Sequence, residues 1–292
     1  PFESFDFSSF ESHEGPGLDK IIKSLNKAKT DDKIKGIYLD LTSIAGGMAT
    51  LEEIRAALLD FKKSGKWIIS YSEIYTQGTY YLASVSDKIY LNPAGIVEHR
   101  GLSSELMFFK NALEKLDVEM QIIRHGKFKS AVEPYMLEKM SDANREQYEL
   151  LLNTAWGSMV KDVAASRKIS VEKLNELADD MKIQDAKDAK KHGLVDGVLF
   201  KDELLAALRT KLKIEEEDEI NSVSLKKYSK SAKKSPFKKK KKEKKSDNQI
   251  AVIYAAGSIT SGKSNNESMG SETISEAIRE ARLDEDVKAI VL

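Results

Sequence analysis

The sequence has no cysteine and no long apolar run, and each absence excludes a class of protein. Without cysteine the chain has no disulfide, no thiolate metal site and no cysteine nucleophile, although it can occur on either side of a membrane. No run approaches the ~18 to 20 apolar residues that span a bilayer. The longest candidates, such as Ile250 to Ala256, have the length of a strand. We therefore expect no membrane-spanning segment within these residues.

Signatures of metal sites and of common hydrolases are missing as well. The four histidines, His13, His99, His125 and His192, do not have metal-ligand spacing. The strand-turn-helix motif that presents a nucleophilic serine in many hydrolases is not found. We expect no metal and no other cofactor. If the chain is an enzyme, a lysine base that serves a serine nucleophile is the plausible chemistry.

The net charge is zero because two regions of opposite sign cancel. The 292 residues include 47 basic and 47 acidic side chains. Between Lys226 and Lys245 there are 12 lysines and one acid, Glu243, so the rest of the chain has 35 basic and 46 acidic residues. Phosphate binding needs a basic face, which an acidic body does not offer. We expect no nucleic-acid partner.

Short apolar runs alternate with amphipathic segments through the first two thirds of the chain. Runs of strand length, rich in Ile, Val and Tyr, cover 34–41, 67–71, 88–91 and 118–124. Helices are expected from Thr50, which forms a capping box with Glu53, and over 103–116, 141–167, 171–181 and 186–192. This alternation predicts an α/β protein with a largely parallel sheet.

Two of these helices have an apolar face that predicts core packing. On the first the face consists of Leu51, Ile54, Leu58 and Phe61. On the long helix it consists of Tyr148, Leu152, Trp156, Met159 and Val163. We interpret the second stripe as core rather than as a cofactor site, because helical spacing of large apolar residues is typical of a buried face.

An internal repeat relates the start of the chain to its end. Residues 21–39 align without a gap with residues 274–292, and the identical pairs include Asp31 with Asp284. Both copies are typical of a helix, a short acidic turn and a buried strand. We therefore expect a tandem duplication of one α/β unit.

Composition separates the two copies. We expect a first copy over 1–212, a charged linker over 213–248 and the start of a second copy over 249–292. Lysines without interleaved aromatics repel one another, which favours a solvated linker over a nucleic-acid or anionic-lipid site. The chain begins at Pro1 and ends inside an apolar run, so we expect a fragment cut at both ends, from which an N-terminal anchor can be missing.

Residues Gly257 to Ser264 match the phosphate-loop pattern G-x-x-x-x-G-K-[ST] and follow an apolar strand. A working phosphate loop needs a helix that begins at the Lys-Ser pair, so that its N-terminal amides point at the phosphates. Here loop-forming residues follow Ser264, and helical periodicity begins only near Ile274. We interpret the match as a glycine- and serine-rich loop, with a nucleotide hydrolase as the alternative.

The stretch from His125 to Pro134 contains two lysines, Lys127 and Lys129. Composition assigns neither of them a role, because most lysines are simply exposed. The string Gly126-Lys-Phe-Lys-Ser-Ala-Val-Glu-Pro134, together with 77–84 and 87–93, closely resembles the N-terminal half of the signal peptide peptidase A family, also called protease IV. The resemblance covers essentially the whole chain, including the second-copy opening at Ile250.

The resemblance implies a fold and a chemistry. Long members of this family have two tandem copies of a crotonase-like, Clp-protease-like α/β unit, so the second copy here would be truncated. They are serine endopeptidases of the Ser-Lys type, in which the first copy supplies the lysine and the second copy the serine. Lys129 stands at the lysine position, directly before Ser130-Ala-Val-Glu-Pro134, and Lys127 is the runner-up.

Two departures from the family pattern bear on activity. Gln77 stands where the family's catalytic copy has its serine, so the first copy has no nucleophile and the serine is expected beyond Leu292. Ala45-Gly46-Gly47 matches a Pro-Gly-Gly loop, and we interpret it as a structural relic rather than an oxyanion hole. We expect the fragment alone to be inactive.

A general base must be neutral, which requires the lysine pKa to fall by ~3 units from about 10.4. Burial in a cleft can supply such a shift. Arg124 and Lys127 would lower the pKa of Lys129 further, whereas Glu133 would raise it. We therefore expect Glu133 to be engaged elsewhere, for instance by an arginine or a helix N-terminus.

Partners follow from the resemblance alone. It implies cleaved signal peptides, or other apolar extended peptides, as substrates. It also implies a homo-oligomer that associates with the bacterial inner membrane through an N-terminal segment missing from this chain. A non-catalytic crotonase-like scaffold remains the alternative beside the nucleotide hydrolase, and it predicts no serine at the second-copy position that matches Gln77.

Overall fold

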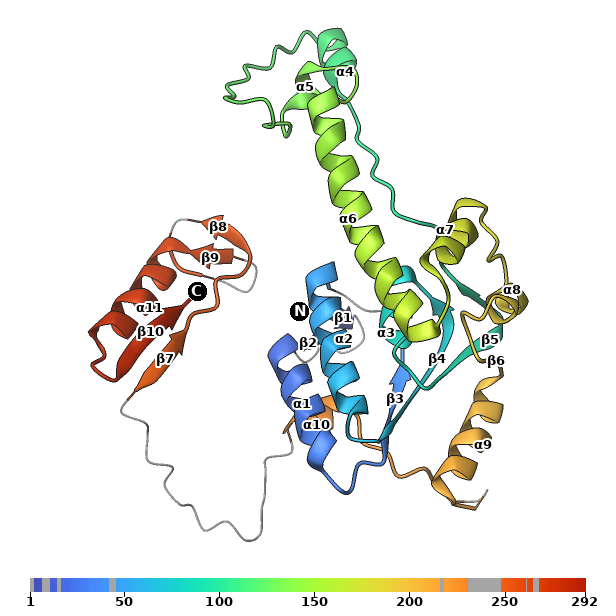
Figure 1. Cartoon of the computed structure of the whole chain (residues 1–292). Helices are drawn as coiled ribbons and strands as arrows, with labels where there is room; N and C mark the ends of the chain where they lie inside the picture. Colours follow the sequence, from blue (N-terminus) through green and yellow to red (C-terminus); the bar gives the residue numbers. More distant parts are fainter. Residues whose placement is uncertain are drawn as a thin grey trace. The chain divides into compact units, whose positions relative to one another are not determined.

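The computed structural model describes residues 17–41, 46–215, 218–230, 248–260, 262–264 and 268–292, together with the backbone of two short strands, β1 (Glu3–Asp6) and β2 (Glu11–Glu14). Contacts divide the chain into two compact units, Pro1–Ala232 and Lys233–Leu292, and each is described by itself (Figure 1). No helix among the described residues is long and apolar enough to cross a membrane.

A four-stranded parallel sheet lies at the centre of the first unit. Its order is β3 (Gly36–Asp40), β4 (Trp67–Tyr75), β5 (Lys88–Val97) and β6 (Gly197–Val198). Along β4, Ile68 packs into the main apolar core, whereas Ile69 and Tyr71 pack on the other side. A strand that is buried on both faces is typical of parallel sheets covered by helices. The predicted α/β class with a parallel sheet is confirmed.

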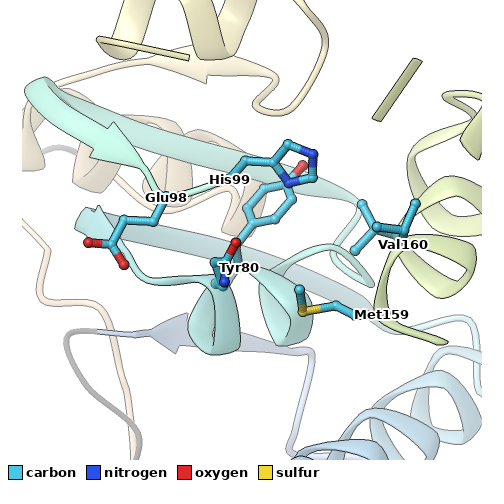
Figure 2. A pocket seen from close by; sticks show the side chains of 7 residues that line it. Tyr80, Glu98, His99, Met159 and Val160 are labelled. Carbon is cyan, nitrogen blue, oxygen red and sulfur yellow. The ribbon is translucent and has the colours of Figure 1, made fainter. Parts of the chain in front are cut away.

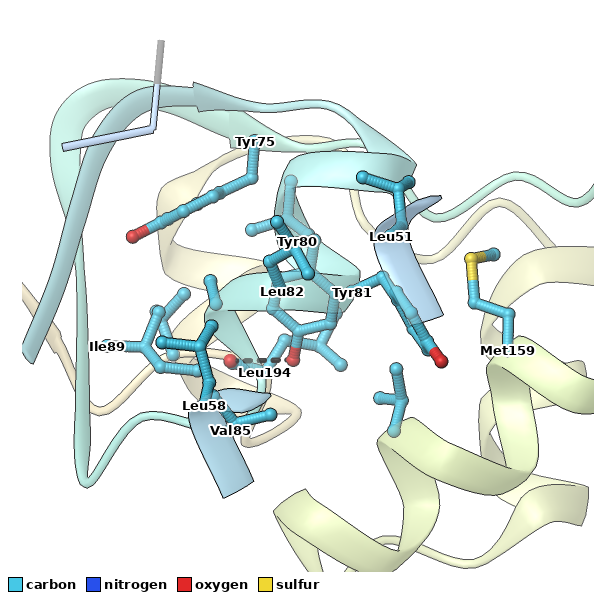
Figure 3. Packing of buried hydrophobic residues seen from close by; sticks show 14 of the residues in the cluster. Leu51, Leu58, Tyr75, Tyr80, Tyr81, Leu82, Val85, Ile89, Met159 and Leu194 are labelled. Carbon is cyan, nitrogen blue, oxygen red and sulfur yellow. Dashed lines mark hydrogen bonds between the residues drawn. The ribbon is translucent and has the colours of Figure 1, made fainter. Parts of the chain in front are cut away.

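Helices cover both faces of this sheet. On one side α1 (Leu18–Thr30), α2 (Met48–Lys62), α3 (Gln77–Ala83), α7 (Val171–Asp179), α8 (Ala186–Lys191) and one end of α6 (Asp142–Arg167) enclose the main core. Figure 3 shows side chains of α2, α3 and α6 meeting around Tyr80 and Tyr81. On the other side α9 (Lys201–Leu212) supplies Leu204 and Leu208.

Helix α2 begins earlier than its capping pattern predicts. The helix starts at Met48, with Gly47 as its N-cap, so the predicted start at Thr50 is wrong. The Thr50 amide already donates to the Gly47 carbonyl at 3.0 Å, which places Thr50 inside the first turn. The predicted apolar face is confirmed, because all four of its side chains, Leu51, Ile54, Leu58 and Phe61, are buried.

The long helix α6 leaves the core and extends to a second cluster of short elements (Figure 1). It begins at Asp142 after the N-cap Ser141, close to the predicted start. The predicted stripe is buried at Met159 and Val163, near the sheet, which confirms the core interpretation for that half. In the other half the stripe residues Tyr148 and Leu152 are half-buried, and Leu150 and Leu151, which lie outside the stripe, are 70% and 63% exposed.

A buried arginine fastens α6 to the body of the unit. Arg55 of α2 is 3% exposed, and its guanidinium donates to the Tyr81 carbonyl at 2.6 Å and to the Asp162 carbonyl at 2.8 Å. It also donates to the hydroxyls of Ser84 and Ser166. Removal of a buried charge's partners typically costs several kcal/mol, about 3 to 5. Arg55 therefore fixes the direction in which α6 leaves the core.

The segment between β5 and α6 differs most from the sequence prediction. The strand predicted over 118–124 is wrong, since these residues form no strand, and the helix predicted from Ser103 begins only at Lys110 as α4 (Lys110–Lys115). Helix α4, the residues that follow it and α5 (Glu133–Met136) lie at the end of α6 that is remote from the sheet (Figure 1). A strand needs a neighbour for its backbone groups, and that position offers none.

The first unit extends beyond the predicted boundary at Leu212. Helix α10 (Leu225–Lys230) packs on α1, where the Tyr228 hydroxyl donates to Asp31 at 2.8 Å and the Lys27 amine lies 4.2 Å from the Tyr228 ring centre. This part of the lysine-rich segment is therefore folded onto the first unit and is not a solvated linker. Residues 231–247 lie outside the described residues.

The second unit has a small parallel pair of strands, β7 (Gln249–Val252) and β10 (Val287–Val291), and a helix, α11 (Ser271–Leu283). Between them β8 (Ser258–Thr260) pairs with β9 (Ser268–Gly270). At the 253-residue offset of the sequence repeat, the bounds of α1 and α11 coincide. In each unit the aspartate after the helix, Asp31 or Asp284, accepts from the backbone amide two residues later, at 3.1 and 2.9 Å.

Candidate active site

Lys129 lies in the loop between α4 and α5, which we call the lysine loop (117–132). The loop turns at Gly126, whose φ of +97° is a conformation that glycine adopts without strain. Lys127 lies in this turn, with its amine 5.1 Å from the Phe128 ring centre. The two lysines are therefore separated by a turn. An extended backbone that would place both on one side is not present.

The carboxylate of Glu133 is buried and turned toward the start of α6. Its side chain is 1% exposed, and Oε1 accepts from the Ser141 hydroxyl at 2.6 Å. Oε2 accepts from the Ser141 amide at 3.2 Å and from the Asn144 side chain at 3.1 Å. Arg124 approaches from the lysine loop, with 3.7 Å between its NH1 and Oε1. The prediction that an arginine and a helix N-terminus engage Glu133 is confirmed.

These contacts decide the charge of Glu133. Burial by itself raises the pKa of a carboxyl group. The hydrogen bonds from Ser141 and Asn144, together with the positive charge of Arg124, outweigh burial and hold the pKa of Glu133 below its usual value. The side chain is therefore a carboxylate at neutral pH, and its oxygens contact the start of α6 and Arg124.

The backbone of the lysine loop is held on both sides of Lys129. Arg124 donates from NH1 to the Lys129 carbonyl, and Gln147 of α6 donates to the Phe128 carbonyl, both at 3.5 Å, the long end of the hydrogen-bond range. After the loop, the Phe109 amide donates to the Pro134 carbonyl at 2.6 Å. The peptide groups around Lys129 are thus tied to neighbouring elements, while its side chain is exposed.

The Lys129 amine makes no hydrogen bond or ion pair with the described residues. The burial predicted for this base is therefore not supplied by the part of the chain that the structure describes. An open depression of ≈ 740 Å³ lies beside α5 and is lined by Lys110 and residues 136–142. Any desolvation of Lys129 has to come from a further segment or from a bound peptide.

Gln77, which the sequence resemblance predicts to match a catalytic serine, has a structural role that the sequence does not reveal. It begins α3, after Thr76, whose hydroxyl caps the helix. The side-chain amide of Gln77 donates to the Gly101 carbonyl at 2.8 Å and accepts from the amides of Arg100 and Gly101 at 3.0 and 3.1 Å. Gln77 thus binds the backbone that leaves β5, and its amide is not a nucleophile.

The other predicted elements of a catalytic centre are incomplete in this unit. Gly47 caps α2 and Gly46 precedes it, whereas Ala45 lies outside the described residues. A small cavity of ≈ 10 Å³ lies between α3, α6 and the end of β5, and its lining includes Tyr80, Glu98 and His99 (Figure 2). Such a cavity has space for no more than about one water molecule. It cannot accept a substrate.

His99, beside this cavity, is 5% exposed, and its Nε2 lies 2.8 Å from the Leu174 carbonyl. Its ring centre lies 5.2 Å from that of Trp156. Burial lowers the pKa of His99, although the Leu174 carbonyl acts in the opposite direction. Within the described ranges no group of three or more potential metal ligands occurs.

The phosphate-loop match has the geometry of an ordinary loop. Helix α11 begins at Ser271 rather than at Lys263. The Glu272 amide in its first turn donates to the Gly262 carbonyl at 2.9 Å, and the Ser264 amide donates to the Thr273 hydroxyl at 2.9 Å. The chain's own carbonyl thus occupies a helix amide that a phosphate would need. Ser261 and residues 265–267 lie outside the described residues.

Comparison with known proteins adds the family. The model of Peptidase family S49 matches residues 60–215, which include Gln77 and the lysine loop. The chain is 34% identical to Protease 4 of Salmonella typhi over 281 residues, which are 93% of this chain and 44% of that protein. The chain belongs to peptidase family S49. The resemblance to the signal peptide peptidase A family is thereby confirmed.

Two further relatives agree. Protease 4 of Haemophilus influenzae is 32% identical over 93% of this chain and 45% of its own length. The chloroplastic serine protease SPPA of Arabidopsis thaliana is 29% identical over 96% of this chain and 41% of its own length. The S49 chain thus spans less than half the length of these relatives.

Proposed function

We propose that this S49 chain supplies Lys129 as the general base of a serine peptidase of the Ser-Lys type. The neutral amine would take the proton of a serine hydroxyl, the resulting alkoxide would attack a peptide carbonyl, and water would later hydrolyse the acyl-enzyme. Gln77 occupies the matching position of this copy, so we propose that the serine comes from outside residues 1–292. Lys127 is the alternative base.

The engagement of Glu133 carries this proposal. A free carboxylate beside Lys129 would raise the lysine pKa and keep the amine protonated. Instead the Glu133 carboxylate accepts from Ser141 and Asn144 and faces Arg124. The Lys129 amine is therefore left without a carboxylate partner within the described part of the chain.

We also propose that the two units are tandem copies of one crotonase-like, Clp-protease-like unit. The coincident bounds of α1 and α11 support this, as do the matching turns at Asp31 and Asp284. The boundaries 1–212, 213–248 and 249–292 remain a prediction, modified by the packing of α10 on α1.

The proposed substrates are apolar extended peptides, including cleaved signal peptides. One of the relatives, from Enterococcus faecium, is named a putative signal peptide peptidase. Large apolar side chains are exposed at the end of α4, on the lysine loop and on the adjoining half of α6, among them Leu116, Ile123, Phe128, Leu150 and Leu151. Such a surface suits contact with an apolar peptide, which would also exclude water from Lys129.

We propose the same setting as the family resemblance implies, namely a homo-oligomer at the bacterial inner membrane, attached through an N-terminal segment and without a nucleic-acid partner. A non-catalytic scaffold is the rival. The test is kcat/KM for a peptide substrate in the full-length protein with Lys129→Ala, Lys129→Arg and Lys127→Ala. We expect both Lys129 variants to be inactive, because guanidinium cannot act as a base. Normal activity of Lys129→Ala would overturn the assignment.

A further inference from the structure

Two side chains of opposite charge connect the lysine loop to α6. Arg124 precedes Lys129 by five residues and Glu133 follows it by four, and their charged groups meet at 3.7 Å. The Glu133 side chain is 1% exposed and that of Arg124 is 34% exposed. Water therefore screens this pair on one side only, which makes it stronger than a fully exposed ion pair.

Each of the two side chains also contacts something other than its partner. Glu133 is fastened to the first turn of α6 through Ser141 and Asn144. Arg124 donates to the Lys129 carbonyl. A continuous chain of contacts thus runs from the N-terminus of α6 through Glu133 and Arg124 to the backbone of Lys129.

We propose that Arg124 and Glu133 are positioning residues for Lys129, a role that rests on the proposed function of Lys129 as the base. Glu133 anchors the loop to helix α6. Arg124 pairs with Glu133 and donates to the Lys129 carbonyl, so it links the anchored carboxylate to the backbone of Lys129. Neither side chain touches the substrate. Displacement of a catalytic group by about 1 Å can cost ~100-fold in rate, so loss of the anchor should lower kcat while KM changes little.

The two members of the pair carry opposite charges. A positive charge near an amine favours its neutral form and a negative charge favours its protonated form, so we expect removal of Arg124 and removal of Glu133 to act on a nearby amine in opposite directions. The other charged or titratable groups on the loop and on the elements beside it are Asp117, Glu119, His125 and Lys127 of the loop, Lys110, Glu114 and Lys115 of α4, Glu138 and Lys139 after α5, and Asp142, Arg145, Glu146 and Glu149 of α6. Apart from Arg145, which is changed only in the control, these groups are the same in all the variants below, so differences between the pair variants isolate the pair.

The test compares pH profiles of kcat/KM for Arg124→Gln and Glu133→Gln in the full-length protein. We expect each variant to lose about 10- to 100-fold in kcat, with KM within about threefold of the parent. The ascending limb should move up by ~0.3 to 1 pH unit in Arg124→Gln and down by a similar amount in Glu133→Gln. The double variant should restore the position of the limb but not kcat. Arg124→Lys should keep the limb and lose part of kcat.

Arg145→Gln is the matched control. Arg145 pairs with Glu149 on α6 at 3.8 Å, with both side chains 62% exposed, and it does not contact the lysine loop through any bond in the described residues. It should leave both kcat and the limb unchanged. Limbs that stay in place, or that move in the same direction in the two variants, would show that the pair is merely structural and would overturn the inference. Active Lys129→Ala would instead overturn the proposed function, so the two failures are distinguishable.

Discussion

Ser141 donates its hydroxyl proton to Glu133 at 2.6 Å while the same oxygen accepts the Asn144 amide at 3.2 Å. One side chain therefore begins α6 and fixes the carboxylate that follows the lysine loop. Ser141 and Glu133 are eight residues apart in the sequence and belong to different elements. The stability of α6 and the position of the loop are consequently coupled through Ser141.

Ser141→Ala should cost more stability than the loss of a helix cap. An N-cap serine contributes about 0.5 to 2 kcal/mol. The variant also leaves the buried Glu133 carboxylate with one hydrogen bond fewer, which adds about 1 to 3 kcal/mol. The control is Ser170→Ala at the N-cap of α7, where the hydroxyl accepts the Lys173 amide at 3.1 Å. Urea unfolding followed by tryptophan fluorescence measures both variants, and equal losses would contradict the coupling.

Residues 1–292 by themselves should show no peptidase activity. The motivating observation is that Gln77 holds the backbone at Gly101 instead of presenting a nucleophile. Hydrolysis of a fluorogenic peptide should stay at the buffer level, and a serine-directed phosphonate probe should not label the chain. Gln77→Ser should not create activity, because a hydroxyl cannot replace the three hydrogen bonds of the amide. Probe-sensitive turnover by the unmodified 292 residues would sink this prediction.

Much of the first unit follows from local patterns. The apolar face of α2 is buried where periodicity predicts, and that of α6 is buried at Met159 and Val163, because an amphipathic helix packs its apolar stripe against the core. The segment 118–124 alternates apolar and polar residues in the same way as a strand, yet Val118 is 45% and Ile123 is 99% exposed. Alternation predicts a strand only where a neighbouring strand exists, and that neighbour is decided by the tertiary fold.

Some features of the candidate site could likewise be predicted from the sequence, and others could not. The diversion of Glu133 follows from electrostatics, because a base beside an unpaired carboxylate would stay protonated. The structural role of Gln77 does not, since its partners lie 23 and 24 residues later in the chain. The exposure of the Lys129 side chain does not follow from the sequence either, because burial depends on segments that the local sequence does not specify.

The glycine- and serine-rich loop of the second unit should not bind nucleotide. A phosphate would have to displace the Gly262 carbonyl from the Glu272 amide and the Thr273 hydroxyl from the Ser264 amide. Isothermal titration of MgATP into the chain should give no saturable heat. Lys263→Ala should behave like the parent. Micromolar binding that Lys263→Ala abolishes would instead support a nucleotide hydrolase.

His99 should make the first unit less stable as the pH falls below about 6.5. In the unfolded chain its imidazole binds a proton near that pH, whereas burial lowers the pKa in the fold. The unfolded state therefore binds more protons, and the free energy of unfolding falls with decreasing pH, by at most about 1.4 kcal/mol per unit, until the folded pKa is reached. Above about 6.5 both states are neutral and His99 contributes no slope.

The measurement that isolates His99 is urea unfolding of the parent and of His99→Gln between about pH 5 and 8. The glutamine amide can still donate to the Leu174 carbonyl but does not titrate in this range. Trp67 and Trp156, the two tryptophans of the chain, both lie in the first unit, so their fluorescence reports on that unit alone. The other histidines titrate equally in both proteins and cancel in the difference. We expect the parent to lose its advantage over His99→Gln as the pH falls from about 7 to 5, and parallel stability curves would rule out a buried neutral His99.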